Sequence, residues 1–224
     1  MATDVALLRL LQLVSPALPI GMYSYSQGME SAVADGWLKD SEDCKDWLKG
    51  LMQNALSHTD LPILARLYQA WQDNDQAEVL TWSRSLLAYR ETAELRLEDR
   101  QCGQALARLL VPLGFADMQA WTRHPDTTLA LAFSFAAVRW QLTLPQTLMG
   151  YLWSWLENQV LCAVKLVPLG QVAGQRLLID LADAIPMLIE QALQLGDAEL
   201  GGSAFSLALT SSRHEMQYSR LFRS

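Results

Sequence analysis

The stretch TTLALAFSFAAVRWQL, residues 127–142, decides the fold predicted for this chain. Its side chains are apolar on almost every face of a helix, and its only charge is Arg139. A helix that is apolar all round is buried, either in the core of a large domain or in a membrane. A membrane span needs roughly 20 residues with few or no charges, and Arg139 interrupts this run. The stretch therefore predicts a buried helix at the centre of the fold.

Helical periodicity continues on both sides of this stretch, and strand signals are nearly absent. We expect further helices at residues 5–13, 24–34, 41–52, 60–71, 77–110 (with a break near 89–92), 118–121 and 144–165. Ser24 or Ser26 would cap the second of these. A last long helix follows residue 170, and Pro186 either kinks or divides it. The sequence thus predicts a single all-α domain of about ten helices. Residues 1–200 form the helical core, and residues 203–224 form a C-terminal tail that becomes ordered when a partner binds.

The composition excludes several classes of protein. Apolar residues make up 51% and charged residues 18% of the 224 residues, which argues against global disorder. The net charge of -7 disfavours nucleic acid as a partner. The 3 cysteines lie far apart, as in a reduced cytosolic protein, and no signal peptide or membrane span is evident. We expect a cytoplasmic protein that binds neither nucleic acid nor membrane.

The motifs of common enzyme classes are missing from this sequence. It contains no phosphate loop, no nucleophile elbow and no paired cysteines, and its 3 histidines, His58, His124 and His214, stand alone. We therefore expect no catalytic, cofactor-binding or metal-ligating residues within one protomer. A metal site shared across a two-fold axis stays open, since symmetry doubles each histidine.

Charged residues at helical spacing have two interpretations. One run combines acidic and basic side chains: Glu91, Glu94, Glu98 and Asp99, with Arg90, Arg96 and Arg100. The favoured interpretation is a solvated helix face with intrahelical ion pairs, and the alternative is acid/base chemistry. Lys165 ends an apolar helix. It either caps that helix, with its stem on apolar surface, or supplies a charge that fixes a partner or holds the tail.

Three stretches taken together resemble one family. LLQLVSPALPIGMYSYSQGME near the start, AVKLVPLGQ and the C-terminal SSRHEMQYSRLFRS resemble the urease accessory protein UreF, and LARLYQA and RETAELRLEDRQ fit the same family. The resemblance covers essentially the whole chain. It implies an all-α homodimer that binds UreD (also called UreH) and then the GTPase UreG. In that complex UreF acts as a non-catalytic assembly factor, and GTP hydrolysis is coupled to nickel insertion into apo-urease.

The early stretch SPALPIGMYSYSQGME, residues 15–30, is predicted to be a contact surface. Tyrosine offers a large contact area at low entropic cost, and serine and glutamine add polar specificity. We expect one tyrosine to face inward and the other outward, and the surface to dock the GTPase or the dimer partner. Its candidate residues are Tyr23, Tyr25, Ser26, Gln27 and Glu30.

The C-terminal tail is predicted to be a second contact segment. It is locally basic, carries apolar anchors, and follows a glycine-rich linker expected to be mobile at Gly196, Gly201 and Gly202. From the resemblance we expect the tail to dock against UreD or against an adjacent UreF helix. Its candidate residues are Arg213, His214, Glu215, Tyr218, Arg220, Leu221, Phe222 and Arg223.

Two other functions compete with the assembly factor. A GTPase-activating protein could supply Arg220 in trans to UreG as an arginine finger. An all-α enzyme would need an apolar pocket with convergent polar groups. A rise in GTP turnover by UreG that depends on one arginine would distinguish the GTPase-activating protein from the assembly factor. The presence of such a pocket would distinguish the enzyme from it.

Overall fold

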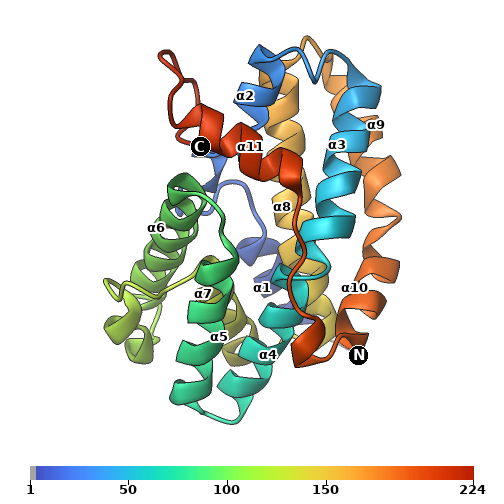
Figure 1. The fold of residues 1–224 in the computed structure, drawn as a ribbon. Helices are drawn as coiled ribbons and strands as arrows, with labels where there is room; N and C mark the ends of the chain where they lie inside the picture. Colours follow the sequence, from blue (N-terminus) through green and yellow to red (C-terminus); the bar gives the residue numbers. More distant parts are fainter. Residues whose placement is uncertain (1–3) are drawn as a thin grey trace.

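Helix α7 (Leu129–Arg139) is enclosed by neighbouring helices, chiefly α4 and α6, in the computed structural model, which describes residues 4–224 (Figure 1). Every residue of α7 from Ala130 to Ala137 is buried. The rings of Trp71 and Phe135 pack in a T-shaped arrangement with 5.0 Å between their centroids. The prediction of a buried helix is confirmed, and its apolar surface is covered by other helices of the same chain, although it lies within one of two helix groups and not at the centre of the whole fold.

The remaining elements confirm the all-α prediction, since residues 4–224 contain eleven α-helices and no strand. Within those residues no helix combines the length and the apolar character that crossing a membrane requires. The other elements are α1 (Asp4–Leu13), the 3-10 turn η1 (Met22–Ser24), α2 (Met29–Ala34), α3 (Ser41–Leu51), the π-helical turn η2 (Met52–Leu56), α4 (Asp60–Gln72), α5 (Gln76–Tyr89), α6 (Ala93–Leu110), the 3-10 turn η3 (Ala116–Trp121), α8 (Leu144–Leu166), α9 (Gln171–Ala182), α10 (Ile185–Gln194), the 3-10 turn η4 (Asp197–Glu199) and α11 (Phe205–His214).

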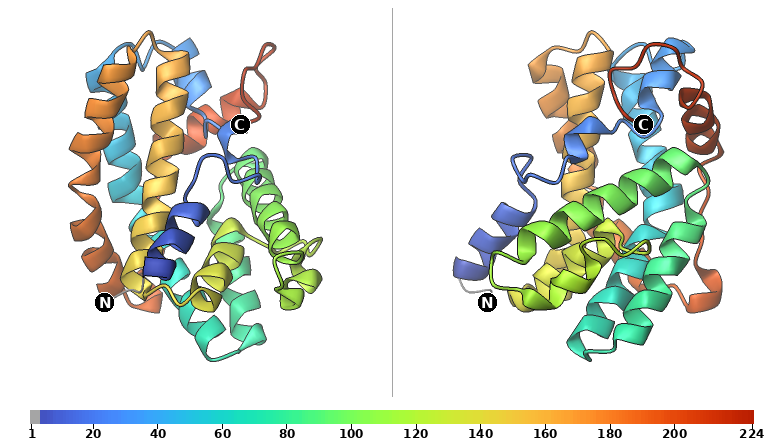
Figure 2. Two further views of the ribbon diagram at one scale, coloured as in Figure 1. Left: turned by 180° about the vertical axis from the view of Figure 1, so that it is seen from behind. Right: turned by 90° about the vertical axis from the view of Figure 1, so that its left-hand side faces the viewer.

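The helices form two packed groups (Figures 1 and 2). Helices α4, α5, α6 and α7 pack together in one group, and α3, α8, α9 and α10 pack together in the other. Contacts of α4 with α8 and α10 join the groups, while α11 lies across α2 and α6. One continuous hydrophobic core runs through both groups. The junction between the groups is where the candidate site lies.

Most predicted boundaries are confirmed, and local chemistry explains them. Thr143 and Gln146 form a capping box at the start of α8. Pro186 stands in the first turn of α10, so it divides the last long helix instead of kinking it. The predicted start of α2 is wrong: the helix begins at Met29, because Gln27 (φ 53°) and Gly28 (φ 76°) have left-handed backbones that a helix cannot contain.

Helix α11 was not predicted, because it falls within the segment expected to be a tail. It packs on α2 at Gly28, where an added Cβ would lie 2.6 Å from Thr210 Oγ1. The linker before it is also held in place, which the prediction of a mobile linker did not anticipate. The Gly201 N–H donates to the His58 carbonyl at 3.0 Å, and the Gly202 N–H donates to Thr59 Oγ1 at 3.0 Å.

Candidate functional site

The two predicted contact segments lie side by side, although about 200 residues separate them. The Arg223 N–H donates to the Ser24 carbonyl at 2.8 Å, and the Ser26 N–H donates to the Ser224 carbonyl at 2.7 Å. The Ser26 hydroxyl donates to the same Ser224 oxygen at 2.7 Å. These bonds join the backbone of residues 24–26 to that of residues 223–224. Residues 22–30 and 213–224 therefore form one site, which we call the tail site.

Glu30 is a central acceptor of the tail site. Its side chain is 9% exposed, and its two oxygens accept the N–H groups of Leu221 at 2.7 Å and of Phe222 at 2.8 Å. Hydrogen bonds to a carboxylate are shorter and stronger than neutral ones, and they satisfy a charge that burial would otherwise penalise. Glu30 thus positions the tail and is not itself exposed to a partner.

A buried charge network holds the start of the tail. His214 is fully buried between two carboxylates, with Nδ1 2.8 Å from Glu94 and Nε2 3.4 Å from Glu30. Arg220 donates to Glu94 at 2.8 Å, so the same carboxylate binds the tail twice. The Glu215 carboxylate accepts the first N–H groups of α6, where a negative charge is favourable.

Lys165 contacts the tail through Phe222. The Lys165 ammonium lies 5.6 Å from the centroid of the Phe222 ring, which is within the range of a cation–π contact. Phe222 is buried against the core and is the apolar anchor of the tail. Lys165 also lies in the last turn of α8, so its position fits both interpretations: the cation stands at the C-terminal end of the helix and contacts the tail.

The two tyrosines of the contact surface point in opposite directions, as predicted. Tyr25 is 3% exposed, and its hydroxyl donates to Gln101 Oε1 at 2.5 Å. Burial raises the pKa of the Tyr25 hydroxyl, so it stays a neutral donor. Tyr23 is 60% exposed and is available to a partner.

Gln27 joins the tail site to α6 and α8. Its amide nitrogen donates to Glu98 Oε1 at 2.8 Å, and its amide oxygen accepts the Trp155 indole N–H at 2.8 Å. Glu98 also accepts the Ser224 hydroxyl at 3.0 Å. One buried carboxylate therefore contacts both predicted segments.

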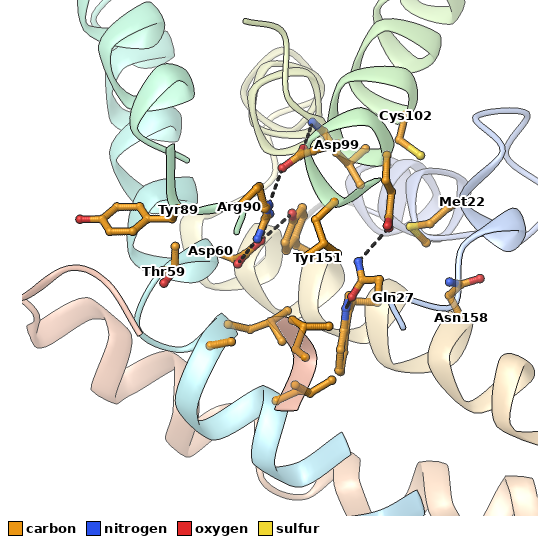
Figure 3. Close-up of a pocket in the computed structure, with 18 of the residues that line it drawn as sticks. Met22, Gln27, Thr59, Asp60, Tyr89, Arg90, Asp99, Cys102, Tyr151 and Asn158 are labelled. Carbon is orange, nitrogen blue, oxygen red and sulfur yellow. Dashed lines mark hydrogen bonds and ion pairs between the residues drawn. The ribbon is translucent and has the colours of Figure 1, made fainter. Parts of the chain in front are cut away.

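The prediction of a solvated charged face is wrong for part of α6. Glu98 and Asp99 are both buried, and Arg90 lies between Asp99 (Nε to Oδ2, 2.9 Å) and Asp60 (Nη1 to Oδ2, 3.0 Å). Figure 3 shows Arg90 reaching toward both aspartates, with Tyr151 beside Asp60. Burial disfavours the charged guanidinium, but Asp60 and Asp99 outweigh it and hold the pKa of Arg90 well above its ordinary value.

These buried charges line a cavity of about 60 Å³ between the two helix groups (Figure 3). Its charged side chains bond one another, and its volume is far below the roughly 300–1,000 Å³ of ligand pockets. The geometry does not favour the small-molecule enzyme. Within residues 4–224, no three or more His, Cys, Asp and Glu side chains group closely enough to hold a metal ion.

The tail presents its other side chains to solvent. Tyr218 is completely exposed, and Leu221 and Met216 are also mostly exposed. Arg213 pairs with Asp35 at 2.5 Å, and the Arg213 guanidinium lies 5.7 Å from the Trp37 ring centroid. The tail site therefore has a buried set of residues that fixes the backbone and an exposed set that is free for contact.

Sequence reasoning did not assign to this site Ser224 or the residues that bind the two segments from α6 and α8, among them Glu94, Glu98, Gln101 and Trp155. Glu94 and Glu98 lie at ordinary helical spacing, and Ser224 lies 126 residues from its partner Glu98. No local pattern distinguishes a carboxylate that binds a distant segment from one that faces water. The only available signal was the high density of charges on α6.

Comparison with known proteins gives one consistent result. The family model described as UreF matches residues 38–182. A protein of Alkalilimnicola ehrlichii named urease accessory protein UreF is 51% identical over 216 residues, which are 96% of this chain and 95% of the relative. A protein of the same name from Pseudomonas putida is 49% identical over 224 residues, which are the full length of both chains. Another of the same name, from Azoarcus sp., is 49% identical over 97% of this chain and 95% of the relative. The Pseudomonas putida match includes both halves of the tail site.

Proposed function

The chain belongs to the UreF family of urease accessory proteins, and we propose that it is a non-catalytic assembly factor in urease activation. In this proposal it forms a complex with UreD and the GTPase UreG, and it couples GTP hydrolysis to nickel insertion into apo-urease. The metal is the cargo of the complex and not a resident cofactor of this chain.

The observation that supports the proposal most is the exposed set of the tail site. Tyr218 and Leu221 stand in solvent on a backbone that Glu30 holds by two hydrogen bonds. Exposed tyrosine and leucine side chains on a pre-ordered backbone suit protein recognition, because little further entropy is lost on binding. We propose that this set binds UreD, and that Tyr23 contributes to the contact with UreG or with a second protomer.

The arginine-finger alternative has less support from the geometry. Arg220 is engaged three times, by the Glu94 carboxylate, the Glu215 carbonyl and the Gln217 carbonyl. A finger must reach into another protein's nucleotide site, so Arg220 would have to leave all three acceptors. If Arg220→Lys lowers UreG turnover by orders of magnitude, the alternative is favoured after all.

We further propose a homodimer in the cytoplasm. The dimer is what the UreF resemblance implies. The cytoplasmic compartment agrees with three cysteines that are free and buried rather than joined in disulfides.

The test is size-exclusion chromatography with light scattering on the full chain mixed with UreD, and then with UreG, GTP and nickel. The wild-type chain is expected to form a stable UreD complex that captures UreG. Tyr218→Ala combined with Leu221→Ala is expected to lose the UreD complex while the chain stays folded. Met187→Ala, an exposed apolar residue on α10, is the matched control. A double variant that still binds UreD with unchanged stoichiometry would refute the assigned surface.

A further inference from the structure

Helix α6 carries arginines on the side that faces solvent. It lies at the outer edge of its helix group and crosses the front of the molecule in the right-hand view of Figure 2. Helical spacing gathers one set of side chains on this outer side, within about 120° of one another: Arg96, Leu97, Arg100, Gln104 and Arg108. All of them are exposed or partly exposed, and Leu97 is 51% exposed.

The loop after η3 adds a fourth arginine to this side. Arg108 Nη1 donates to the Thr122 carbonyl at 3.2 Å, and the Gln104 amide donates to the His124 carbonyl at 3.0 Å. These bonds hold the exposed Arg123 beside the last turns of α6. We call the four side chains the arginine face: Arg96, Arg100, Arg108 and Arg123. The first and third of them stand about 18 Å apart along the helix axis.

No carboxylate of the described chain neutralises the arginine face. Residues 100–116 contain no Asp or Glu, although the whole chain has a net charge of -7. The next carboxylates along the chain, Asp117 and Asp126, pair with Arg139 and Arg84. Among residues 4–224, none of the four arginines of the face forms an ion pair. A compact positive surface therefore stands open on an acidic protein.

We propose that the arginine face binds an acidic surface of a second protein. The planar guanidinium matches a carboxylate with two parallel hydrogen bonds, so a row of arginines suits a row of Asp or Glu side chains. Arginine is also enriched at protein interfaces, and the exposed Leu97 adds apolar contact area among the charges. That this second protein belongs to the urease assembly rests on the function proposed above.

Other occupants fit the arginine face less well. A second copy of the chain, placed on a two-fold axis through this face, would set the arginines against the same arginines, which repel one another. Nucleic acid is opposed by the net charge of -7. A lipid surface is bound through a broad apolar helix side, whereas Leu97 is the one exposed apolar side chain between Arg96 and Arg108.

The arginine face and the tail site can be occupied at the same time. The contacts of the tail site on α6 end at Gln101, whose Oε1 accepts the Tyr25 hydroxyl. Arg108 lies about 10 Å further along the helix axis, and Arg123 lies beside it. A partner bound at the tail site therefore leaves these two arginines free for another protein.

Binding of an acidic peptide tests the arginine face in the absence of any natural partner. The variant Arg108→Glu with Arg123→Glu changes two exposed side chains and leaves the core untouched. Lys49→Glu with Arg176→Glu, two exposed cations on α3 and α9, is the control with the same change in net charge. Fluorescence anisotropy measures the affinity of each full chain for labelled poly-L-glutamate.

Wild type and control are expected to bind the peptide, more weakly as NaCl is raised, and the face variant is expected to bind at least about 100-fold more weakly. Absence of binding to wild type would overturn the proposal, and so would equal affinities of the face variant and the control. A short DNA duplex or phosphatidylserine vesicles that bind wild type more tightly than the peptide, and lose this binding in the face variant, would overturn the assignment to a protein.

Assembly with the proposed partners separates this inference from the proposed function. The face variant is expected to keep the UreD complex, which is assigned to the tail site, but to bind either UreG or apo-urease at least about 100-fold more weakly than the control does. A face variant that assembles like wild type would overturn the arginine face and leave the proposed function standing. A wild-type chain that binds neither UreD nor UreG would refute the proposed function, and the peptide measurement would then decide the arginine face by itself.

Discussion

Replacing Glu30 by glutamine tests whether the tail is held by the chain itself. The carboxylate accepts two backbone N–H groups, from Leu221 at 2.7 Å and from Phe222 at 2.8 Å. Glutamine has nearly the same shape but only one acceptor atom. Its amide nitrogen would point at one of the two N–H groups, so two donors would face each other. The contact with His214 would also lose its negative partner.

The size of the effect follows from these two bonds. One bond changes from charge-assisted to neutral, which costs about 1 kcal/mol. The other is lost and leaves a buried donor unsatisfied, which costs about 2 kcal/mol. The total of about 3 kcal/mol corresponds to a docking constant lowered roughly 150-fold. The cost falls on the tail and not on the core, because Leu221 and Phe222 lie beyond the last helix.

Hydrogen exchange on the full chain measures this change at one pH. In Glu30→Gln the protection of residues 216–224 is expected to fall by about two orders of magnitude, while that of α7 is unchanged. Glu190→Gln on α10 removes an exposed carboxylate and is expected to change neither. Equal protection of the tail in wild type and in Glu30→Gln would refute the view that this carboxylate docks the tail.

Three further predictions concern single contacts. Lys165→Met keeps the apolar stem but removes the cation above Phe222, so tail opening measured by hydrogen exchange should rise only about 2- to 5-fold; a change of 100-fold would contradict a simple cation–π contact. Arg90→Met removes the cation between the buried carboxylates of Asp60 and Asp99, so the free energy of unfolding in urea should fall by about 3–5 kcal/mol. A fall below about 1 kcal/mol would show that these ion pairs are not buried in solution. Gly28→Ala and Gly36→Ala both place a Cβ on a left-handed backbone, but only at Gly28 does that Cβ meet α11, 2.6 Å from a side-chain atom. Gly28→Ala should therefore lower the melting temperature and the hydrogen-exchange protection of the tail more than Gly36→Ala does. Equal values in the two variants would argue against the close contact.

Local sequence patterns predicted most of the fold. The apolar run at 127–142, the break near 89–92 and Pro186 placed α7, the α5–α6 boundary and the α9–α10 boundary. Each of these signals acts within one or two helical turns, through side-chain burial, capping or the missing proline N–H. The patterns failed at the start of α2, where contacts of Gln27 with α6 and α8 stabilise a backbone that local propensity disfavours.

The sequence predicted two separate contact surfaces, and the structure brings residues of both together at the tail site. That these residues contact a partner stays a prediction. The opposite orientation of Tyr23 and Tyr25 was also predicted correctly. The predicted contact residues differ in exposure, however, and some of them are buried. Glu30 and Phe222 were expected at a partner contact, but they are buried and position the backbone of the tail. Whether a partner orders the tail further stays a prediction.

The sequence by itself determined most of the helices and their limits, and the buried apolar run of α7, because these depend on neighbours within a few residues. Only the tertiary structure decided which charges are buried and which segments pair. Glu98 and Glu91 look alike in sequence, but one lies under Ser224 and the other faces solvent. The physical reason is that the protonation and the partners of a carboxylate depend on water access and on groups brought together from distant parts of the chain, and helical periodicity carries no record of either.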